Sequence, residues 1–563
     1  MTNEKRKMKK IVMRPPLLVY TIIAVLSIAM SSCMDDETFT TSPTDRLEFS
    51  ADTIRLDTVF SRVPSSTRTF WVYNNNQKAV RCRTVRLDRG NQTGFRVNVN
   101  GIYLGETQGW QLSDEEILGG DSLRVYVEAT TPYNGLDRPQ KVSDKLVFTL
   151  ESGTVQEVEL EVWSWDADIV NGIRVSRDTV LNSSKPTVVH GDILVDEGAT
   201  LTIPAGKTLY MHSGARIIVS GSLKCLGEPG NEVVLRGDRL DRMFDYLPYD
   251  GVSGQWGGIV FRESSYDNVI SYTDLHGACD AVVCDSSDID RTKLTMHHSS
   301  VHNNKGHGLY ADNSRLTITN SVVSNCLGSC LYIAGGDISV NGCTLAQFYP
   351  FDANRGDALT FTDTIDTAKR TIRRLDVANS IITGYADDVI MAYLADTVAK
   401  PYRFSHCMLR TPTPSDTTCF KRIIWEDVED TVIAGWKNFM KVDTDLLQYD
   451  FSLSMSSLAI DAADPSTSPS DDRNGTQRDS KPDMGCYEAI REEGTLSTPP
   501  RLYVQAHRGV DNGNRPPKKH ISLSTSVDNN PLSIIMPYEE YRTCDPYNCL
   551  LSRRAGAFRQ RAC

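Results

Sequence analysis

The sequence predicts an all-β protein in which an antiparallel β-sandwich precedes a parallel β-helix. Two observations support this fold class. Residues 47–165 alternate between apolar and polar side chains in about seven short stretches, separated by turn signals such as Asn100-Gly101 and Ser152-Gly153. Short alternating strands with regular turns are typical of a β-sandwich. Residues 294–345 then repeat with a spacing of 22 residues, and a fixed period of this length indicates stacked repeats.

The repeat places like residues at like positions. Leu294, Leu316 and Ile338 are spaced 22 residues apart, and the series continues at Leu375 and Tyr402 after longer intervals. A second apolar series keeps the same step and consists of Leu309, Leu331, Leu359 and Ile390. Apolar and polar residues alternate within each repeat, so the repeating element is a strand. The simplest assembly has one coil per repeat, with successive coils about 4.8 Å apart.

The strand pattern breaks four positions after the first residue of each repeat. This position is occupied by His298, Asn320, Gly342, Asn379 and His406. Asn and Gly tolerate a left-handed backbone, so we expect a turn there. The residue that follows is always small, and its side chain is expected to point back into the core. These small residues are Ser299, Ser321, Cys343, Ser380 and Cys407.

This pattern resembles the right-handed parallel β-helix proteins of the pectate-lyase-like superfold. The resemblance covers roughly residues 186–490 and implies a right-handed, single-stranded β-helix. Residues 482–488, Pro-Asp-Met-Gly-Cys-Tyr-Glu, resemble the terminal segment of β-helix lipoproteins. We therefore expect residues 449–490 to close the domain as a C-terminal cap held by ion pairs. The resemblance implies a fold, whereas a reaction has to be argued from a site.

The N-terminus resembles a bacterial lipoprotein signal over residues 1–33. A basic leader precedes the apolar run from Leu17 to Met30, which is too short to span a membrane. The run ends in Met30-Ser31-Ser32-Cys33, similar to a lipobox, so Cys33 is the expected lipidation site. The acidic stretch that follows resembles the surface-export signal of Bacteroides-type lipoproteins. We expect a monomer anchored in the outer membrane by acyl chains and facing outward. An ordinary cleaved signal and a periplasm-facing anchor are the alternatives.

Other segments are expected to lie outside the two folded domains. Residues 34–46 form a polar tether, and residues 166–186 cross between the domains. Residues 494–563 lose the repeat and carry ten Lys and Arg against five Asp and Glu, which predicts a disordered or aberrant tail. The formal net charge of −12 argues against a nucleic-acid partner. Core candidates in the sandwich are Phe70, Trp71, Phe95, Phe148 and Trp163.

Two insertions in the β-helix are candidate ligand-binding loops. They cover residues 236–257 and 346–374, and insertions into stacked repeats often collect on the binding face. Their aromatic side chains could stack on sugar rings while charged groups bond the hydroxyls. For residues 236–257 the favoured interpretation is a lid whose aromatic residues pack on the flank of the coils, and ligand binding is the alternative. The candidate residues are Phe244, Tyr246, Tyr249, Trp256, Phe351, Arg355 and Asp357.

Catalytic signals are sparse. Gly306-His307-Gly308 matches a short motif of polygalacturonases, and Asp387 with Asp388 suggests the paired acids of that family. In the family the acids precede the histidine, whereas here they follow it by 80 residues. No spacing typical of metal ligands is found, so neither a metal nor another cofactor is expected. The alternatives are calcium at the acids of the terminal segment and a metal at the five histidines between His276 and His307. Disulfide pairing is left open.

The sequence is compatible with three functions. The favoured one is a surface lipoprotein that binds glycan or another extracellular ligand without catalysis. The second is a polysaccharide lyase or glycoside hydrolase acting on acidic polysaccharide, and the third is a structural component of the envelope. An enzyme should bring three or more carboxylates or bases together in one groove. A binding protein should instead present exposed aromatic side chains without that convergence.

Overall fold

The computed structural model describes residues 38–489 apart from 245, 366–367, 396–399, 427 and 430–434. The expected signal segment with Cys33 and residues 494–563 lie outside the described residues. The chain divides into two compact units. One contains the residues up to Asn134 together with Pro139–Ser164, and the other contains Gly135–Arg138 and the residues from Trp165 onward. Within the described residues, no helix has both the length and the apolar character needed to cross a membrane.

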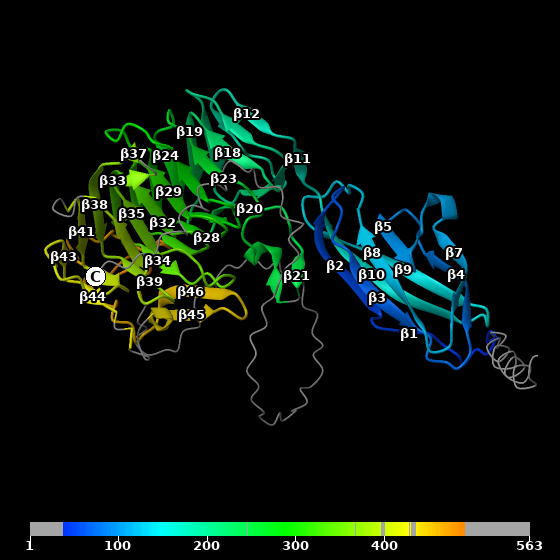
Figure 1. Ribbon diagram of the computed structural model, residues 1–563. Helices are drawn as coiled ribbons and strands as arrows, with labels where there is room; N and C mark the ends of the chain where they lie inside the picture. Colours follow the sequence, from blue (N-terminus) through cyan, green and yellow to red (C-terminus); the bar gives the residue numbers. More distant parts are fainter. Residues whose placement is uncertain are drawn as a thin grey trace, which may run out of the picture. The chain divides into compact units, whose positions relative to one another are not determined.

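The N-terminal unit is the predicted antiparallel sandwich (Figure 1). Its first sheet has the order β1 (Glu48–Phe49), β3 (Arg68–Tyr73), β8 (Ser122–Ala129), β5 (Phe95–Val99) and β6 (Ile102–Tyr103). Its second sheet has the order β2 (Thr53–Phe60), β10 (Val155–Trp165), β9 (Gln140–Leu150), β4 (Val80–Leu87) and β7 (Gln111–Ile117). A short 3-10 helix, η2 (Glu106–Gln108), precedes β7.

Strand alternation decides which aromatic residues enter the sandwich core. Phe70, Phe95 and Phe148 are buried as predicted. Trp71 and Trp163 are instead 40% and 37% exposed. Successive side chains of a strand point to opposite faces, so Phe70 and Trp71 cannot both face inward. The core prediction was therefore wrong for the two tryptophans.

The second unit is a parallel β-helix in which each coil adds one strand to each of three sheets, except that the described coils after β40 add none to the second sheet. We name them sheets I, II and III in the order in which the chain visits them; their strands run from cyan to yellow in Figure 1. Sheet I contains β11 (Asp168–Val170), β14 (Thr187–Val189), β17 (Thr208–Met211), β20 (Val233–Gly237), β25 (Thr273–His276), β28 (Ser300–Asn304), β31 (Val322–Cys326), β34 (Thr344–Gln347), β39 (Ile381–Gly384), β42 (Met408–Leu409) and β44 (Ile424–Trp425).

Sheets II and III follow the same order of coils. Sheet II contains β12 (Ile173–Val175), β15 (Ile193–Val195), β18 (Arg216–Val219), β23 (Gly258–Phe261), β26 (Val282–Cys284), β29 (Leu309–Asp312), β32 (Leu331–Ala334), β35 (Leu359–Thr362) and β40 (Ile390–Tyr393). Sheet III contains β13 (Thr179–Val180), β16 (Thr200–Pro204), β19 (Ser222–Leu226), β24 (Asn268–Ser271), β27 (Leu294–His297), β30 (Arg315–Thr319), β33 (Gly336–Asn341), β38 (Ile372–Ala378), β41 (Tyr402–Ser405) and β43 (Phe420–Lys421).

The first coil begins at Asp168, earlier than the predicted start at residue 186. Its strands have only two or three residues, which is too short for alternation to be visible in the sequence. The segment expected to cross between the domains therefore already belongs to the β-helix.

The predicted ladders are confirmed. Leu294 pairs with Leu316, Leu316 with Ile338, and the series runs on through Leu375 to Tyr402 in sheet III. The second series, from Leu309 to Ile390, stacks in the same way in sheet II. Because like residues repeat at each step, one continuous apolar core fills the β-helix.

The turn between sheets III and I has the predicted conformation. The turn residues have positive φ on five coils: His298 at 52°, Asn320 at 46°, Gly342 at 62°, Asn379 at 49° and His406 at 50°. The small residues that follow are all buried. The hydroxyl of Ser321, for example, accepts a hydrogen bond from the backbone N–H of Ser299 at 3.2 Å. Small side chains fit here because the chain doubles back tightly.

Residues 439–489, which we call the closing segment, pack along the outer face of sheet I. A hairpin of β45 (Phe439–Asp443) and β46 (Gln448–Leu453) follows the 3-10 helix η4 (Gly435–Asn438). Phe451 and Met484 of this segment share a second apolar cluster with Val322, Ile381 and other residues of sheet I. The predicted terminal cap therefore covers a flank of the β-helix.

Ion pairs hold the closing segment, as predicted. Arg473 lies 2.7 Å from Glu232, and Arg478 lies 3.1 Å from Glu488. The positive-φ turn residues between sheets III and I, which we call the turn ladder, also contact this segment. The side-chain amide of Asn320, for example, donates to the carbonyl of Asp471 at 2.9 Å. The ten cysteines within the described residues form no disulfide in this structure.

Candidate functional site

The first predicted loop divides into exposed and buried aromatic residues. Phe244 and Tyr246 lie on the small hairpin of β21 (Arg242–Phe244) and β22 (Leu247–Pro248). Their side chains are 49% and 57% exposed, and their rings stack at 5.7 Å. Tyr249 begins the 3-10 helix η3 (Tyr249–Gly251), and its ring lies under the Arg239 guanidinium at 3.9 Å. Phe244 and Tyr246 are thus available to a ligand, and Tyr249 is half-buried.

Trp256 is a core residue and not a ligand contact. Its side chain is fully buried, and its indole N–H donates to the carbonyl of His276 at 2.9 Å. The prediction failed here because the insertion ends before Trp256, where the chain returns to the stacked coils and meets Ala278.

The second predicted loop brings Phe351 to the surface, where it is 46% exposed. Arg355 is held from two sides. Its Nε donates to the carbonyl of Tyr349 at 2.8 Å, and its guanidinium lies 5.1 Å from the centre of the Tyr385 ring. The two loops meet through a 2.8 Å hydrogen bond between the hydroxyls of Ser253 and Tyr349.

Three other predicted residues fall into one column at the turn between sheets I and II. His307, Asp357 and Asp388 each lie two residues before a sheet II residue of one ladder, namely Leu309, Leu359 and Ile390. Ser329 occupies the intervening coil. The stacking of coils therefore brings together residues that the sequence separates, and it places Asp357 and Asp388 on adjacent coils.

His307 is held within this turn column. Its backbone N–H donates to the carboxylate of Asp280 at 2.6 Å, and its Nδ1 accepts from the backbone N–H of Ser329 at 2.9 Å. Burial lowers the pKa of His307, against the opposing effect of Asp280. The ring is therefore neutral near pH 7, and its Nδ1 already accepts a hydrogen bond. This arrangement is that of a structural residue in a turn.

The carboxylates near this column differ in pKa and in hydrogen-bond partners. Burial, and then the charge of Asp388, raise the pKa of Asp357, although a hydrogen bond from Thr360 opposes the shift. Asp388 accepts from the backbone N–H of Ile390 at 3.2 Å, and the highly exposed Asp387 lies 3.5 Å from Arg410. Asp280 occupies the same column on the coil before His307, and the coil of Ser329 separates this pair from Asp357 and Asp388. The described column therefore has no three carboxylates or bases on consecutive coils.

Sequence reasoning missed a buried ionic cluster beneath the first loop. Both nitrogens of His276 contact carboxylates, Nδ1 with Asp274 at 3.0 Å and Nε2 with Asp250 at 2.8 Å. Arg236 lies 2.8 Å from Asp250, and His302 lies 3.0 Å from Asp274. Burial opposes the charged form of His276, but the two carboxylates outweigh it and raise its pKa to about 10. Positive and negative groups are balanced here, so this cluster fastens the loop to sheet I.

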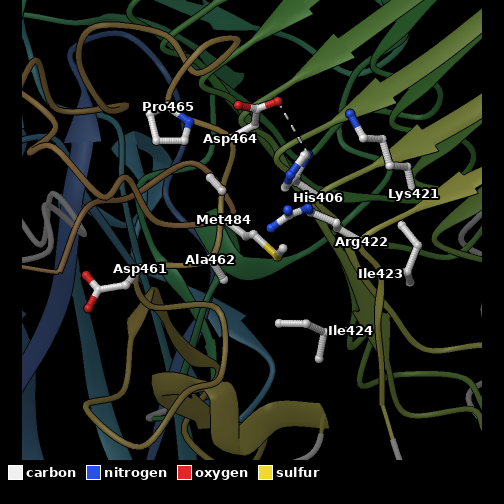
Figure 2. Close-up of a pocket in the computed structure, with 11 residues that line it drawn as sticks. His406, Lys421, Arg422, Ile423, Ile424, Asp461, Ala462, Asp464, Pro465 and Met484 are labelled. Atoms are coloured by element: carbon white, nitrogen blue, oxygen red, sulfur yellow. Dashed lines mark ion pairs between the residues drawn. The ribbon is translucent and has the colours of Figure 1, made fainter.

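A pocket of about 620 Å³ opens beside the last coils, between the turn before sheet I and the closing segment. Figure 2 shows Asp464 facing His406 across the pocket, with Lys421 and Arg422 beside His406, whereas the carboxylate of Asp461 points away from them. The coils contribute His406, Lys421 and Arg422. The closing segment contributes Asp461, Ala462, Ala463, Asp464, Pro465 and Met484, and Ile423 and Ile424 complete the lining.

The pocket offers cationic and hydrogen-bonding groups. Lys421 and Arg422 are exposed, and their side chains form no hydrogen bond or ion pair with any described residue. Nδ1 of the 7% exposed His406 lies 3.7 Å from Asp464 and has no hydrogen-bond partner among the described residues. Burial lowers the pKa of His406; the charge of Asp464 opposes this shift, and the two cations add to it. A neutral imidazole and two free cations are thus available for a polar, anionic ligand.

The sequence held only a weak signal of this pocket. Lys421 and Arg422 are adjacent basic residues, but such a pair on a surface is usually just solvated. The acids opposite them come from Asp461 and Asp464, about 40 residues later, and no local motif joins the two groups. Arg422 also has the positive φ of the turn ladder, at 51°, which places it in line with His406.

No protein-family model and no curated protein matches this chain. Among solved structures, a PapD-like domain of human CEP192 matches 23% of this chain and 92% of its own, with 12% identity and a TM-score of 0.16. A family 123 glycoside hydrolase from Clostridium perfringens matches 22% and 26%, with 7% identity and a TM-score of 0.15. The catalytic domain of a GH87 α-1,3-glucanase in complex with nigerose matches 64% and 87%, with 9% identity and a TM-score of 0.14. At such TM-scores these matches carry no argument about function.

Proposed function

We propose that this protein is a lipid-anchored cell-surface protein whose β-helix binds an acidic glycan without cleaving it. The observation that carries the proposal is the pocket formed by Lys421, Arg422 and His406 opposite Asp461 and Asp464. Cations without partners suit the carboxylate of a uronic acid, while carboxylates and a neutral imidazole suit sugar hydroxyls. The lipobox-like sequence at Cys33 supports the anchor, and the acidic stretch behind it supports surface export.

Exposed aromatic residues supply a second element that a glycan-binding surface needs. Phe244 and Tyr246 stack on each other, and both keep about half of their surface accessible. On sheet II, the half-buried rings of Tyr310 and Tyr332 stack at 5.2 Å with an angle of 9°. Aromatic faces of this kind bind the apolar face of sugar rings. Taken with the scattered carboxylates, they favour binding over hydrolysis.

The experiment is a glycan array probed with the full chain and with the variant Lys421→Ser/Arg422→Asn. Ser and Asn occupy the same positions on preceding coils, at Ser405 and Asn379, so the variant should fold. A charge-matched control is Arg55→Ser/Arg174→Ser, at two highly exposed arginines. We expect binding to uronic-acid glycans that the control retains and the variant loses. Equal glycan binding by all three proteins would rule out this pocket as the glycan-binding site.

One observation favours a second function, hydrolysis of a glycan. Asp357 and Asp388 lie on adjacent coils, and the raised pKa of Asp357 is what a general acid requires. Incubation of the full chain with polygalacturonate, followed by a reducing-end assay, tests this function. Release of reducing ends by the wild-type protein and its loss in Asp357→Asn would establish hydrolysis in place of simple binding.

A further inference from the structure

We propose that His190, His212 and Asp238 form a binding site for a divalent transition metal ion such as Zn²⁺. One ligand atom from each residue lies within 4.8 Å of the other two. Imidazole nitrogen and carboxylate oxygen are donors that Zn²⁺ and its neighbours in the first transition row accept. This site lies in the first coils and is separate from the pocket of the proposed function.

Stacking of the coils creates this group of donors. His190, His212 and Asp238 each directly follow a sheet I strand, namely β14, β17 and β20. The preceding residues, Val189, Met211 and Gly237, are consecutive partners in that sheet. Intervals of 22 and 26 residues separate the three donors, so no short metal-binding motif is visible in the sequence.

The donors already approach one another closely. Nδ1 of His212 lies 2.6 Å from the carboxylate of Asp238, and the two imidazole rings lie 4.3 Å apart at an angle of 32°. Nε2 of His190 is buried and has no hydrogen-bond partner among the described residues. A buried polar atom without a partner is costly, and coordination of a metal would remove that cost.

The second group of His and Asp residues provides a contrast. Asp274, His276 and His302 also place ligand atoms within 4.8 Å. Both nitrogens of His276, however, already contact carboxylates, and Arg236 supplies a positive charge next to Asp250. A metal ion would have to displace these partners. The His190 group lacks such a competing cation within the described residues and keeps one nitrogen free.

Access and coordination number fit a metal site with an open position. The side chain of His212 is 51% exposed, so an ion can enter from solvent. Three protein ligands leave at least one position for water or another ligand. Zn–N bonds of about 2.0–2.1 Å require the rings to adjust slightly on binding, which the exposed His212 side chain can do. Because each ligand comes from a different coil, the ion would join three coils and stabilise the start of the β-helix.

The test is calorimetric titration of the full chain with ZnCl₂ after exposed thiols have been alkylated, together with thermal unfolding with and without Zn²⁺. We expect one site that weakens at least tenfold in His212→Ala and in Asp238→Asn, and a rise in the unfolding temperature that those variants lose. The control His302→Ser removes a ligand of the other group and copies Ser324 of the next coil; it should bind Zn²⁺ like the wild-type protein. Absence of saturable binding by the wild-type protein, or equal binding by His212→Ala, would overturn the assignment.

Discussion

The buried ion pair between Arg473 and Glu232 should contribute strongly to the stability of the β-helix. Arg473 belongs to the closing segment, and Glu232 directly precedes the sheet I strand β20. Their charged atoms lie 2.7 Å apart, and Nε of Arg473 donates to Ser300 at 2.9 Å. The Arg473 side chain is only 7% exposed, whereas that of Glu232 is 27% exposed. The contact therefore joins the closing segment to two coils of sheet I.

The magnitude follows from this unequal burial. Glu232→Gln leaves a buried guanidinium without its counter-charge, and breaking a buried pair from one side costs about 3–5 kcal/mol. The partial exposure of Glu232 points to the lower end, about 3 kcal/mol. Arg473→Met leaves a carboxylate that water can reach, at a cost of about 2 kcal/mol. Since the double variant leaves no unpaired charge, we expect a coupling energy of about 2 kcal/mol.

Urea denaturation of the wild-type protein, the two single variants and the double variant measures this coupling energy. Tryptophan fluorescence reports the unfolding. The exposed pair Arg262 and Asp285, 3.3 Å apart with side chains 48% and 36% exposed, provides a control cycle of Arg262→Met and Asp285→Asn. Its coupling energy should stay below about 0.5 kcal/mol. A coupling energy of the Arg473 cycle as small as that of the control would show that this pair does not hold the closing segment.

Three further predictions concern the β-helix. The pKa of His276 is raised from 6.5 to about 10. Its contribution to stability is therefore complete below pH 6.5 and is lost as the pH rises toward 10. The urea midpoint of the wild-type protein should fall across that pH range, and that of His276→Gln should fall less. Leu316→Ala removes a 1% exposed side chain from the core ladder and should lower the free energy of unfolding by about 3 kcal/mol in the same assay; a loss below about 1 kcal/mol would contradict the stacking. Asn320→Gly should cost about 2 kcal/mol for its lost hydrogen bonds, and Asn320→Val about 1–2 kcal/mol more because φ is 46°; equal unfolding midpoints for the two variants would contradict the turn.

The repeat could be predicted because stacking imposes the same requirement on every coil. A position such as that of Leu294, Leu316 and Ile338 meets the same neighbours each time, so the same kind of residue recurs. The left-handed turn at Asn320 and the small residue at Ser321 recur for the same reason. The coil formed by β11, β12 and β13 escaped prediction because its strands are too short to show alternation.

The candidate sites were harder to predict because they are made between coils. His307, Asp357 and Asp388 could each be noticed singly, but only the stacked coils show that they share a column. The pocket joins Lys421 and Arg422 to Asp461 and Asp464 across about 40 residues of chain. Trp256 was mistaken for a loop residue because composition alone does not show where an insertion ends and the core resumes.

Affinity electrophoresis in gels containing polygalacturonate tests non-catalytic glycan binding, because one gel reports both binding and cleavage. We expect the full chain to be retarded, Lys421→Ser/Arg422→Asn not to be retarded, and the polysaccharide around the retarded band to keep its length. Equal mobility of the two proteins, or a zone of shortened polysaccharide around the wild-type band, would contradict non-catalytic binding in the Lys421–Arg422 pocket.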